Sequence, residues 1–174
     1  MRDLTGGATI WFTGLPSAGK TTLAHALAKR LADEGYERVE VLDGDVARTH
    51  LTKGLGFSTE DRAENVRRIG WVASLLARNG VIVLASVISP NRAVRSEVRD
   101  LHGGRFVEVY VATPVEVCSE RDVKGLYAKQ RAGELKGLTG VDDPYEAPIN
   151  PDIVIPTHQQ SIEESVEQLW QALT

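Results

Sequence analysis

The chain has 174 residues, a formal net charge of −4 at pH 7 and a single cysteine, Cys118. These values exclude an internal disulfide, give no support for general binding to nucleic acid, and fit one domain spanning residues 1–174. The chain has no apolar stretch of membrane-spanning length and no apolar signal core at its N-terminus, so we expect a cytoplasmic protein without a membrane partner.

Short apolar runs alternate with helix-like segments along the chain. The runs predicted to be strands are often continuous, as buried parallel strands are, and span residues 8–13, 39–42, 81–86, 106–111 and 152–155. The segments predicted to be helices span residues of about 20–34, 45–51, 58–79, 91–102, 114–121 and 161–173. This alternation predicts an α/β fold, with a five-stranded parallel sheet flanked by helices.

The stretch GLPSAGKTT, residues 14–22, joins the first predicted strand to the first predicted helix. It satisfies the pattern G-x-x-x-x-G-K-S/T, in which glycine lets the backbone curl around phosphate oxygens at a positive helix N-terminus. Lys20 is expected to bridge the β- and γ-phosphates, and the Thr21 hydroxyl to bind Mg²⁺. The sequence therefore predicts a site for ATP formed by Gly14, Pro16, Ser17, Ala18, Gly19, Lys20, Thr21 and Thr22.

The second predicted strand ends in VLDGD, which places Asp43 and Asp45 at the carboxyl edge of the sheet, where open α/β folds hold their sites. A carboxylate there can orient Mg²⁺ or accept the proton of an attacking hydroxyl, and we predict Thr21 and Asp45 as the metal ligands. The third strand ends in serine, not in the aspartate usual in motor ATPases and GTPases, and the chain has no NKxD guanine signature. These features favour a small-molecule kinase.

Several arginines indicate a substrate with more than one negative charge. Arg48 shares a helix face with Asp45, and Arg62 shares a face of the third predicted helix with Asn65. Each arginine by itself is more typical of a solvated surface than of a binding site. Together with the basic stretch 121–136, they favour an anionic substrate near the phosphate loop.

Residues 122–150 interrupt the alternation with a stretch rich in glycine, proline and charge. A connection of that length is typically either a disordered surface insert or a functional lid. Its apolar side chains favour a lid that closes on nucleotide and excludes water: Leu126, Tyr127, Leu135 and Leu138. We expect Lys124 to be unpaired until it meets an anionic oxygen of the ligand.

Five motifs resemble, in order, the signatures of adenylylsulfate kinases: GLPSAGKTT, LDGD, LTKGLGFSTEDRAENVRRIG, ISP and ERDVKGLYAKQRAGELKGLTGVDDPYEAP. The resemblance covers roughly residues 8–158 and implies a P-loop kinase fold with a lid. It implies transfer of the γ-phosphate of ATP to the 3′-hydroxyl of adenosine 5′-phosphosulfate (APS), giving 3′-phosphoadenosine 5′-phosphosulfate (PAPS) and ADP. It further implies Mg²⁺ dependence, a cytoplasmic role in sulfate assimilation and a homodimer.

Carried over by position, the resemblance implies roles for the matched residues. Lys20, Asp45 and Ser89 would be catalytic, with Asp45 near the 3′-hydroxyl and Ser89 matching a serine regarded in the family as a phosphoserine intermediate. Phe57 would stack on the adenine of APS, with Leu138 opposite. The implied substrate-binding set is Asp45, Arg48, Phe57, Arg62, Asn65, Ile88, Ser89, Lys124, Gly137 and Leu138.

The chain departs from the family pattern in two places that bear on the site. Leu138 stands where the family has phenylalanine, and leucine packs on a ring with less stacking energy. Asn91 stands where tyrosine is common. In-line transfer to a positioned hydroxyl needs no covalent enzyme intermediate, so we expect Ser89 to hydrogen-bond substrate instead.

Two alternatives remain open at this stage. One is another small-molecule kinase of the same fold, acting on gluconate or a nucleoside, and the arginines and the KGLY block count against it. The other is a nucleotide-binding regulatory module without turnover. Intact Lys20, Thr21 and Asp45 count against that second possibility.

Overall fold

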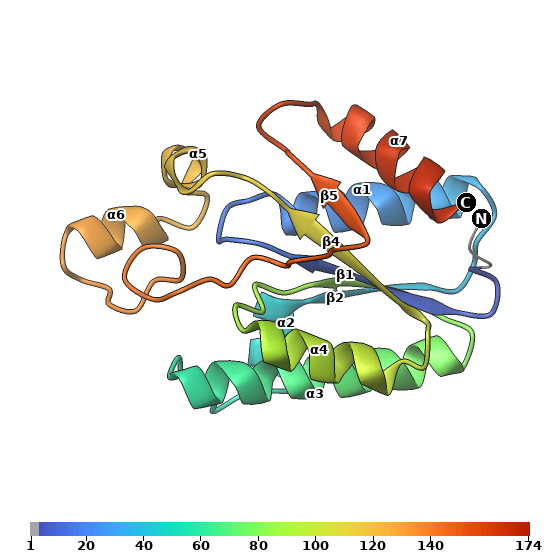
Figure 1. Cartoon of the computed structure of the whole chain (residues 1–174), viewed down its shortest axis with the longest axis horizontal. Helices are drawn as coiled ribbons and strands as arrows, with labels where there is room; N and C mark the ends of the chain where they lie inside the picture. Colours follow the sequence, from blue (N-terminus) through green and yellow to red (C-terminus); the bar gives the residue numbers. More distant parts are fainter. Residues whose placement is uncertain (1–3) are drawn as a thin grey trace.

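The computed structural model describes residues 4–174 and contains the predicted parallel sheet (Figure 1). Every strand pairing is parallel, in the spatial order β2-β3-β1-β4-β5. The strands are β1 (Ala8–Thr13), β2 (Val39–Asp43), β3 (Ile82–Ser86), β4 (Phe106–Val111) and β5 (Ile153–Ile155). The helices are α1 (Lys20–Asp33), α2 (Gly44–Thr49), α3 (Thr59–Arg78), α4 (Arg92–Leu101), α5 (Val115–Arg121), α6 (Leu126–Arg131) and α7 (Ile162–Leu173). All the predicted strands and helices are confirmed, and α6 is an addition.

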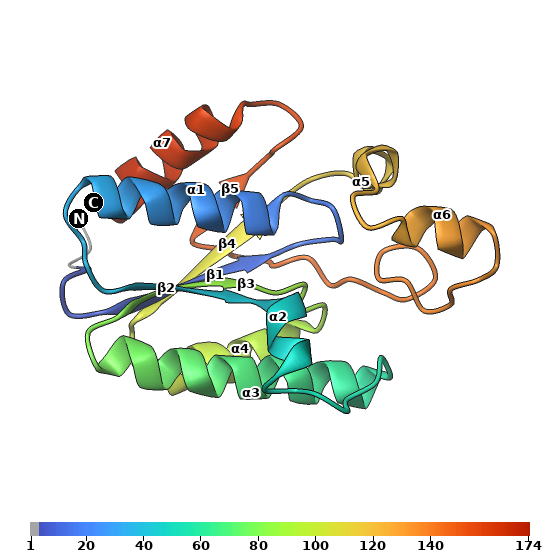
Figure 2. The ribbon, with the colours of Figure 1, turned by 180° about the vertical axis from the view of Figure 1, so that it is seen from behind.

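Helices cover both faces of the sheet, α1 and α7 on one and α3 and α4 on the other (Figures 1 and 2). Side chains of the central strand β1 alternate between the two layers. Ile10 and Phe12 belong to the apolar cluster that includes α1 and α7, whereas Trp11 belongs to the cluster of α3 and α4. Burial on both faces explains why this strand is continuously apolar in sequence. Within residues 4–174, no helix is both long and apolar enough to cross a membrane.

The carboxyl ends of the parallel strands gather the loops that matter at one edge. The phosphate loop follows β1, α2 follows β2, and residues 87–91 follow β3. In Figure 1, α5, α6 and the loop after α6 lie beyond this same edge. Ligand sites of open α/β sheets lie at the carboxyl ends of the strands, so the topology predicts the site at this edge.

Residues 122–150 make defined hydrogen bonds and packing contacts within the segment and with the phosphate loop. The Asp122 carboxylate accepts the amide hydrogens of Tyr127 and Ala128 in the first turn of α6. Tyr127 is buried, and its hydroxyl donates to the carbonyl oxygen of Pro16 at 2.9 Å. The six residues of α6 are too few to show helical periodicity, which is why the sequence did not predict it.

The close packing of α3 on α4 yields a first prediction. A Cβ added at Gly70 would lie 2.6 and 2.7 Å from the two methyl carbons of Val98. We expect Gly70→Ala to lower the free energy of unfolding by about 1–3 kcal/mol, the usual range for overpacking, in urea denaturation. In a Val98→Ala background both methyl carbons are gone and the nearest Val98 atom is Cβ at 3.2 Å, so the same substitution should cost less. An equal cost in both backgrounds would refute the steric explanation.

Candidate active site

The phosphate loop has the tight backbone that its glycines predict. A Cβ on Gly14 would lie 2.8 Å from the carbonyl oxygen of Val111, so only glycine fits beside β4. Gly19 has a φ of 107°, a left-handed value that a side chain would strain, and it is the residue from which α1 begins. The loop therefore turns sharply from β1 and directs the N-terminus of α1 into the cleft.

Lys20 is the buried cation of this loop. It is 8% exposed, and its Nζ donates to the carbonyl oxygens of Gly14 at 3.0 Å and Leu15 at 2.7 Å. Burial, aided by the positive charge of Lys124, lowers the pKa of the Lys20 ammonium to about 8. A phosphate group beside it would supply the negative charge that these neutral carbonyls do not.

Thr21 meets a carboxylate that the sequence did not assign to it. Its hydroxyl donates to Oδ2 of Asp43 at 2.7 Å and lies 3.0 Å from the hydroxyl oxygen of Ser86. Asp43 and Ser86 are partners in the register of β2 and β3, which is what brings them together. Asp43 was recognised as an edge residue, yet Asp45 was predicted as the metal ligand. Three hard oxygen donors thus converge beside the phosphate loop.

Asp43 also caps α2, since its Oδ1 accepts the amide hydrogens of Asp45 at 2.8 Å and Val46 at 3.3 Å. Burial opposes its ionisation, but the Thr21 hydroxyl and these amides prevail and hold the pKa of the Asp43 carboxyl below its ordinary value. A carboxylate so well satisfied is a poor proton acceptor.

Asp45 forms an ion pair with Lys124, which reaches the sheet edge from the lid. The expectation that Lys124 is unpaired is therefore wrong. Both side chains are more than half exposed, so this contact is a weak one that a ligand can replace. It nevertheless shows that the lid places a lysine directly beside the carboxylate at the end of β2.

Two arginines lie on the opposite side of the cleft from the phosphate loop. Arg48 donates to the carbonyl oxygen of Gly56 at 3.0 Å, and its guanidinium stands 4.3 Å from the centre of the Phe57 ring. Burial and the neighbouring charge of Arg62 lower the pKa of Arg48. Two cations that repel one another favour an anion between them. Phe57 is 69% exposed, so one face of its ring is free to stack.

Arg62 joins α3 to the lid. It pairs with Asp143 at 3.1 Å and donates to the hydroxyl of Thr139 and the carbonyl oxygen of Gly137. Asn65, one turn along the helix, accepts a hydrogen bond from the hydroxyl of Thr52 at 2.7 Å. Leu138 is 5% exposed and belongs to the main apolar cluster of the protein, although it also borders the cleft.

Ser89 borders the cleft, but its hydroxyl lies within the protein. The residue is 1% exposed and has a φ of 45°. Its Oγ accepts the indole hydrogen of Trp11 at 3.0 Å and lies within hydrogen-bond distance of the Thr13 hydroxyl and the Val87 carbonyl. This hydroxyl has its hydrogen bonds satisfied by the core, which supports a structural role and not a covalent one.

One cleft of about 640 Å³ brings together every predicted site residue except Gly14 and Ala18. Ala18 lies beneath the loop, where its carbonyl oxygen accepts hydrogen bonds from Thr113 and Thr157. The sequence prediction also omitted Asp43, Ser86 and Arg121, which line the same cleft. Asp43 was recognised at the end of β2 but not assigned a role, the serine that ends β3 was noted only as a difference from motor ATPases and GTPases, and Arg121 was noted only as part of the basic stretch 121–136. Strand register and the position of α5 bring Ser86 and Arg121 to the cleft.

Comparison with known proteins gives one consistent family. The family model described as adenylylsulphate kinase matches residues 6–156. The chain is 63% identical to a probable adenylyl-sulfate kinase of Synechocystis sp. over 167 residues, which is 96% of this chain and 93% of that protein. These values favour the adenylylsulphate kinase family over the gluconate or nucleoside kinases with which the phosphate loop alone is compatible.

Solved structures agree with the sequence comparison. The APS kinase CysC of Mycobacterium tuberculosis, in complex with AMPPNP and APS, superposes with a TM-score of 0.92 at 45% identity, covering 96% of this chain and 97% of that one. A hexameric APS kinase from Thiobacillus denitrificans gives a TM-score of 0.72 at 37% identity, covering 97% of this chain and 29% of that one. The first match shows that this chain and a solved APS kinase share one fold over 96% of this chain.

The lowered pKa of Lys20 predicts how nucleotide affinity depends on pH. Phosphate contact favours the ammonium form, so above pH 8 binding must take up a proton and affinity should fall, by up to about tenfold per pH unit. Calorimetric titration of a non-hydrolysable triphosphate analogue in two buffers of different ionisation enthalpy will show this uptake. Lys20→Arg, which stays charged, should lack the pH dependence. Flat affinity across pH 7–9.5 in the native protein would contradict the assignment.

The hydrogen bonds of Ser89 predict that removing its hydroxyl lowers the stability of the protein but does not abolish phosphoryl transfer. Ser89→Ala leaves the Trp11 indole hydrogen buried without an acceptor, which should lower the free energy of unfolding by about 1–3 kcal/mol. In a Trp11→Phe background the same change should cost less, as a double-mutant cycle will measure. Phosphoryl transfer should remain measurable in Ser89→Ala. Complete loss of transfer in a folded variant would restore the phosphoserine intermediate.

Proposed function

This chain belongs to the adenylylsulphate kinase family, and from that premise we propose that it transfers the γ-phosphate of ATP to the 3′-hydroxyl of APS, forming PAPS and ADP in sulfate assimilation. The observation that carries the proposal is the cleft itself. The phosphate loop with its buried Lys20 lines the same continuous cleft as Arg48 and Arg62. This arrangement suits two anionic nucleotides bound end to end.

The donor half of the cleft would hold the triphosphate of ATP. The amides at the start of α1 point into the cleft, and the Lys20 ammonium would exchange its carbonyl partners for phosphate oxygens. That exchange stabilises the negative charge of the transferring group without moving the backbone. Preorganised positive charge of this kind supplies much of the rate enhancement of phosphoryl transfer.

The oxygen donors of Thr21, Asp43 and Ser86 fit Mg²⁺, which prefers one or two protein oxygens and takes its other ligands from phosphates and water. Among residues 4–174 there is no cluster of three or more His, Cys, Asp or Glu side chains able to hold a metal by itself, which agrees with a cation that arrives with the nucleotide. When bound, Mg²⁺ neutralises charge on the phosphates. We place Asp43 beside Thr21 in this role and keep Asp45 for the proton.

The acceptor half would hold APS. Arg48 and Arg62 would pair with its phosphosulfate, and Phe57 offers an exposed ring face for the adenine. Asp45 would accept the proton of the attacking 3′-hydroxyl once Lys124 exchanges the carboxylate for an anionic oxygen of the ligand. Closure of the lid over both halves would exclude water as a competing acceptor.

We also propose that the protein acts as an oligomer in the cytoplasm. A hexameric relative supports assembly in general, and we retain the homodimer as the specific proposal. A cytoplasmic location follows from the ATP that the reaction needs. Size-exclusion chromatography with light scattering will measure the number of subunits.

The proposed activity is tested by which acceptor is used. A coupled assay of ADP release should show turnover with APS and none with gluconate or nucleosides, and mass spectrometry should identify PAPS. Asp45→Asn should lower kcat by about 10²–10⁴-fold, the usual contribution of a general base, with little change in the KM for ATP.

Asp33→Asn provides the control for that variant. Asp33 is an exposed carboxylate of α1 paired with Lys29, so its removal should leave the rate unchanged. Turnover of gluconate or a nucleoside in preference to APS would overturn the proposed function. A full rate in Asp45→Asn would overturn only the role of that carboxylate.

A further inference from the structure

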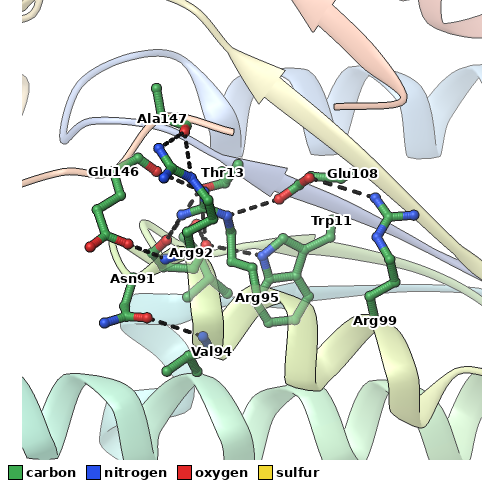
Figure 3. A network of polar contacts seen from close by, with 12 residues as sticks. Trp11, Thr13, Asn91, Arg92, Val94, Arg95, Arg99, Glu108, Glu146 and Ala147 are labelled. Carbon is green, nitrogen blue, oxygen red and sulfur yellow. Dashed lines mark hydrogen bonds and ion pairs between the residues drawn. The ribbon is translucent and has the colours of Figure 1, made fainter. Parts of the chain in front are cut away.

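A buried arginine outside the described machinery connects three segments that are far apart in sequence. Arg95, on α4, is 2% exposed. Its Nε donates to the Glu108 carboxylate at 2.8 Å, Nη1 to the carbonyl oxygen of Ser89 at 2.6 Å, and Nη2 to the carbonyl oxygen of Glu146 at 2.7 Å (Figure 3). The guanidinium therefore holds together β4, the turn that borders the cleft and the far end of the lid.

Energetics make this contact hard to break. A buried guanidinium must keep both a counter-charge and partners for its remaining hydrogens, because each unpaired group would carry its full desolvation penalty. Glu108 supplies the charge. The two loop carbonyls supply the partners, so neither loop can move away without leaving a buried charge incompletely bonded.

The first of these loops is the one that borders the acceptor half of the cleft. Ser89 has a φ of 45°, which is sparsely populated for a residue other than glycine. The Thr13 hydroxyl donates to the carbonyl oxygen of Ile88 at 2.7 Å, next to the carbonyl that Arg95 binds. The turn that places Ile88 and Ser89 against the cleft is thus held from inside the protein, by groups that do not themselves line the cleft.

The second loop is the end of the lid. The Tyr145 hydroxyl lies 3.0 Å from the Thr13 hydroxyl, and the Glu146 amide donates to the carbonyl oxygen of Pro90 at 2.9 Å. The Glu146 carboxylate accepts the backbone amide hydrogen of Arg92, whose own side chain donates to the carbonyl oxygen of Ala147 at 2.8 Å. Residues 145–147 are therefore bound to the turn. Earlier in the lid, the ion pair of Lys124 is half exposed, Tyr127 donates to the carbonyl oxygen of Pro16, and Arg62 pairs with Asp143.

We propose that Arg95 is a positioning residue for the acceptor: it fastens residues 145–147 to the turn 87–90, so that the lid moves only in its part before Tyr145 and the acceptor half of the cleft keeps its shape while the lid opens. This proposal rests on the proposed function for the identity of the acceptor. Its mechanical part, a fixed lid end, does not. The competing explanation is that the Arg95–Glu108 pair only stabilises the fold.

Two matched double variants separate these explanations. Arg95→Met with Glu108→Met removes both charges of the buried pair, which commonly preserves stability, but also removes the two loop contacts. Arg67→Met with Glu97→Met removes an exposed Arg–Glu pair between α3 and α4 that touches neither loop. Arg95→Lys is a third variant, which keeps a positive charge but has one nitrogen in place of the three that bond Glu108, Ser89 and Glu146.

Hydrogen exchange tests whether residues 145–147 are fixed to the turn, and it needs no acceptor substrate. In the native protein the amides of Arg92 and Glu146 should be more strongly protected than those of residues 132–137, whose hydrogen bonds lie within the part of the lid that moves. Both Arg95 variants should lose that protection by at least tenfold, and the Arg67/Glu97 variant should keep it. Unchanged protection in a folded Arg95 variant would overturn the fastening. Should the methionine pair unfold, Arg95→Lys decides the question alone.

Steady-state kinetics test whether Arg95 positions the acceptor half of the cleft. Both Arg95 variants should raise the KM for APS at least tenfold and change the KM for ATP less than twofold, because the phosphate loop makes no contact with Arg95. A purely structural role predicts no such split between the two substrates, and an unchanged KM for APS would overturn the proposal. Absence of APS turnover in the native protein would instead overturn the proposed function, with hydrogen exchange still deciding whether the lid end is fixed.

Discussion

An ammonium group buried at the start of α1 is the constraint around which the cleft is built. Lys20 lies inside the phosphate loop, and its ammonium donates hydrogen bonds to the neutral carbonyl oxygens of Gly14 and Leu15. To bring those carbonyls inward the loop must turn tightly, and it can do so because Gly14 lies against β4 where no Cβ would fit. The same positive charge that shapes the loop is the one that phosphates would neutralise, so the local structure and the proposed chemistry have one cause.

The negative side of the site is placed by the sheet. In many nucleotide-binding folds the carboxylate that assists the metal ends the strand next to β1, and here that strand, β3, ends in Ser86. Asp43 takes up the task from β2, because strand register sets it beside Ser86 and within 2.7 Å of the Thr21 hydroxyl. Asp43 is thereby saturated with hydrogen bonds, which leaves Asp45 as the carboxylate with an exchangeable partner.

The lid is held differently at its two ends, and this difference suits an enzyme with two nucleotide substrates. Toward its start, Lys124 pairs with Asp45 through exposed side chains, a contact that a ligand can replace at small cost, and Tyr127 bonds the carbonyl oxygen of Pro16 in the phosphate loop. At its end, Arg95 and Arg92 bind the backbone of residues 146 and 147 from α4. Opening one end while holding the other would let substrates enter without dismantling the turn that carries Ile88 and Ser89.

Sequence alone determined every strand, every helix except α6, and many of the residues that line the cleft. Continuous apolar runs identified the strands, helical spacing identified the longer helices, and the phosphate loop was recognised because its motif lies within nine consecutive residues. The arginines at 48 and 62 were found for the same reason, as charges on a regular helix.

The rest required tertiary structure, because the deciding partners lie far apart in the chain. Thr21 meets Asp43 and Ser86 through strand register, and Lys124 meets Asp45 across 79 residues. Arg95 reads in sequence as one more surface charge. It joins turn and lid only because Glu108, Ser89 and Glu146 converge on it in a buried position, where a charge must have hydrogen-bond partners.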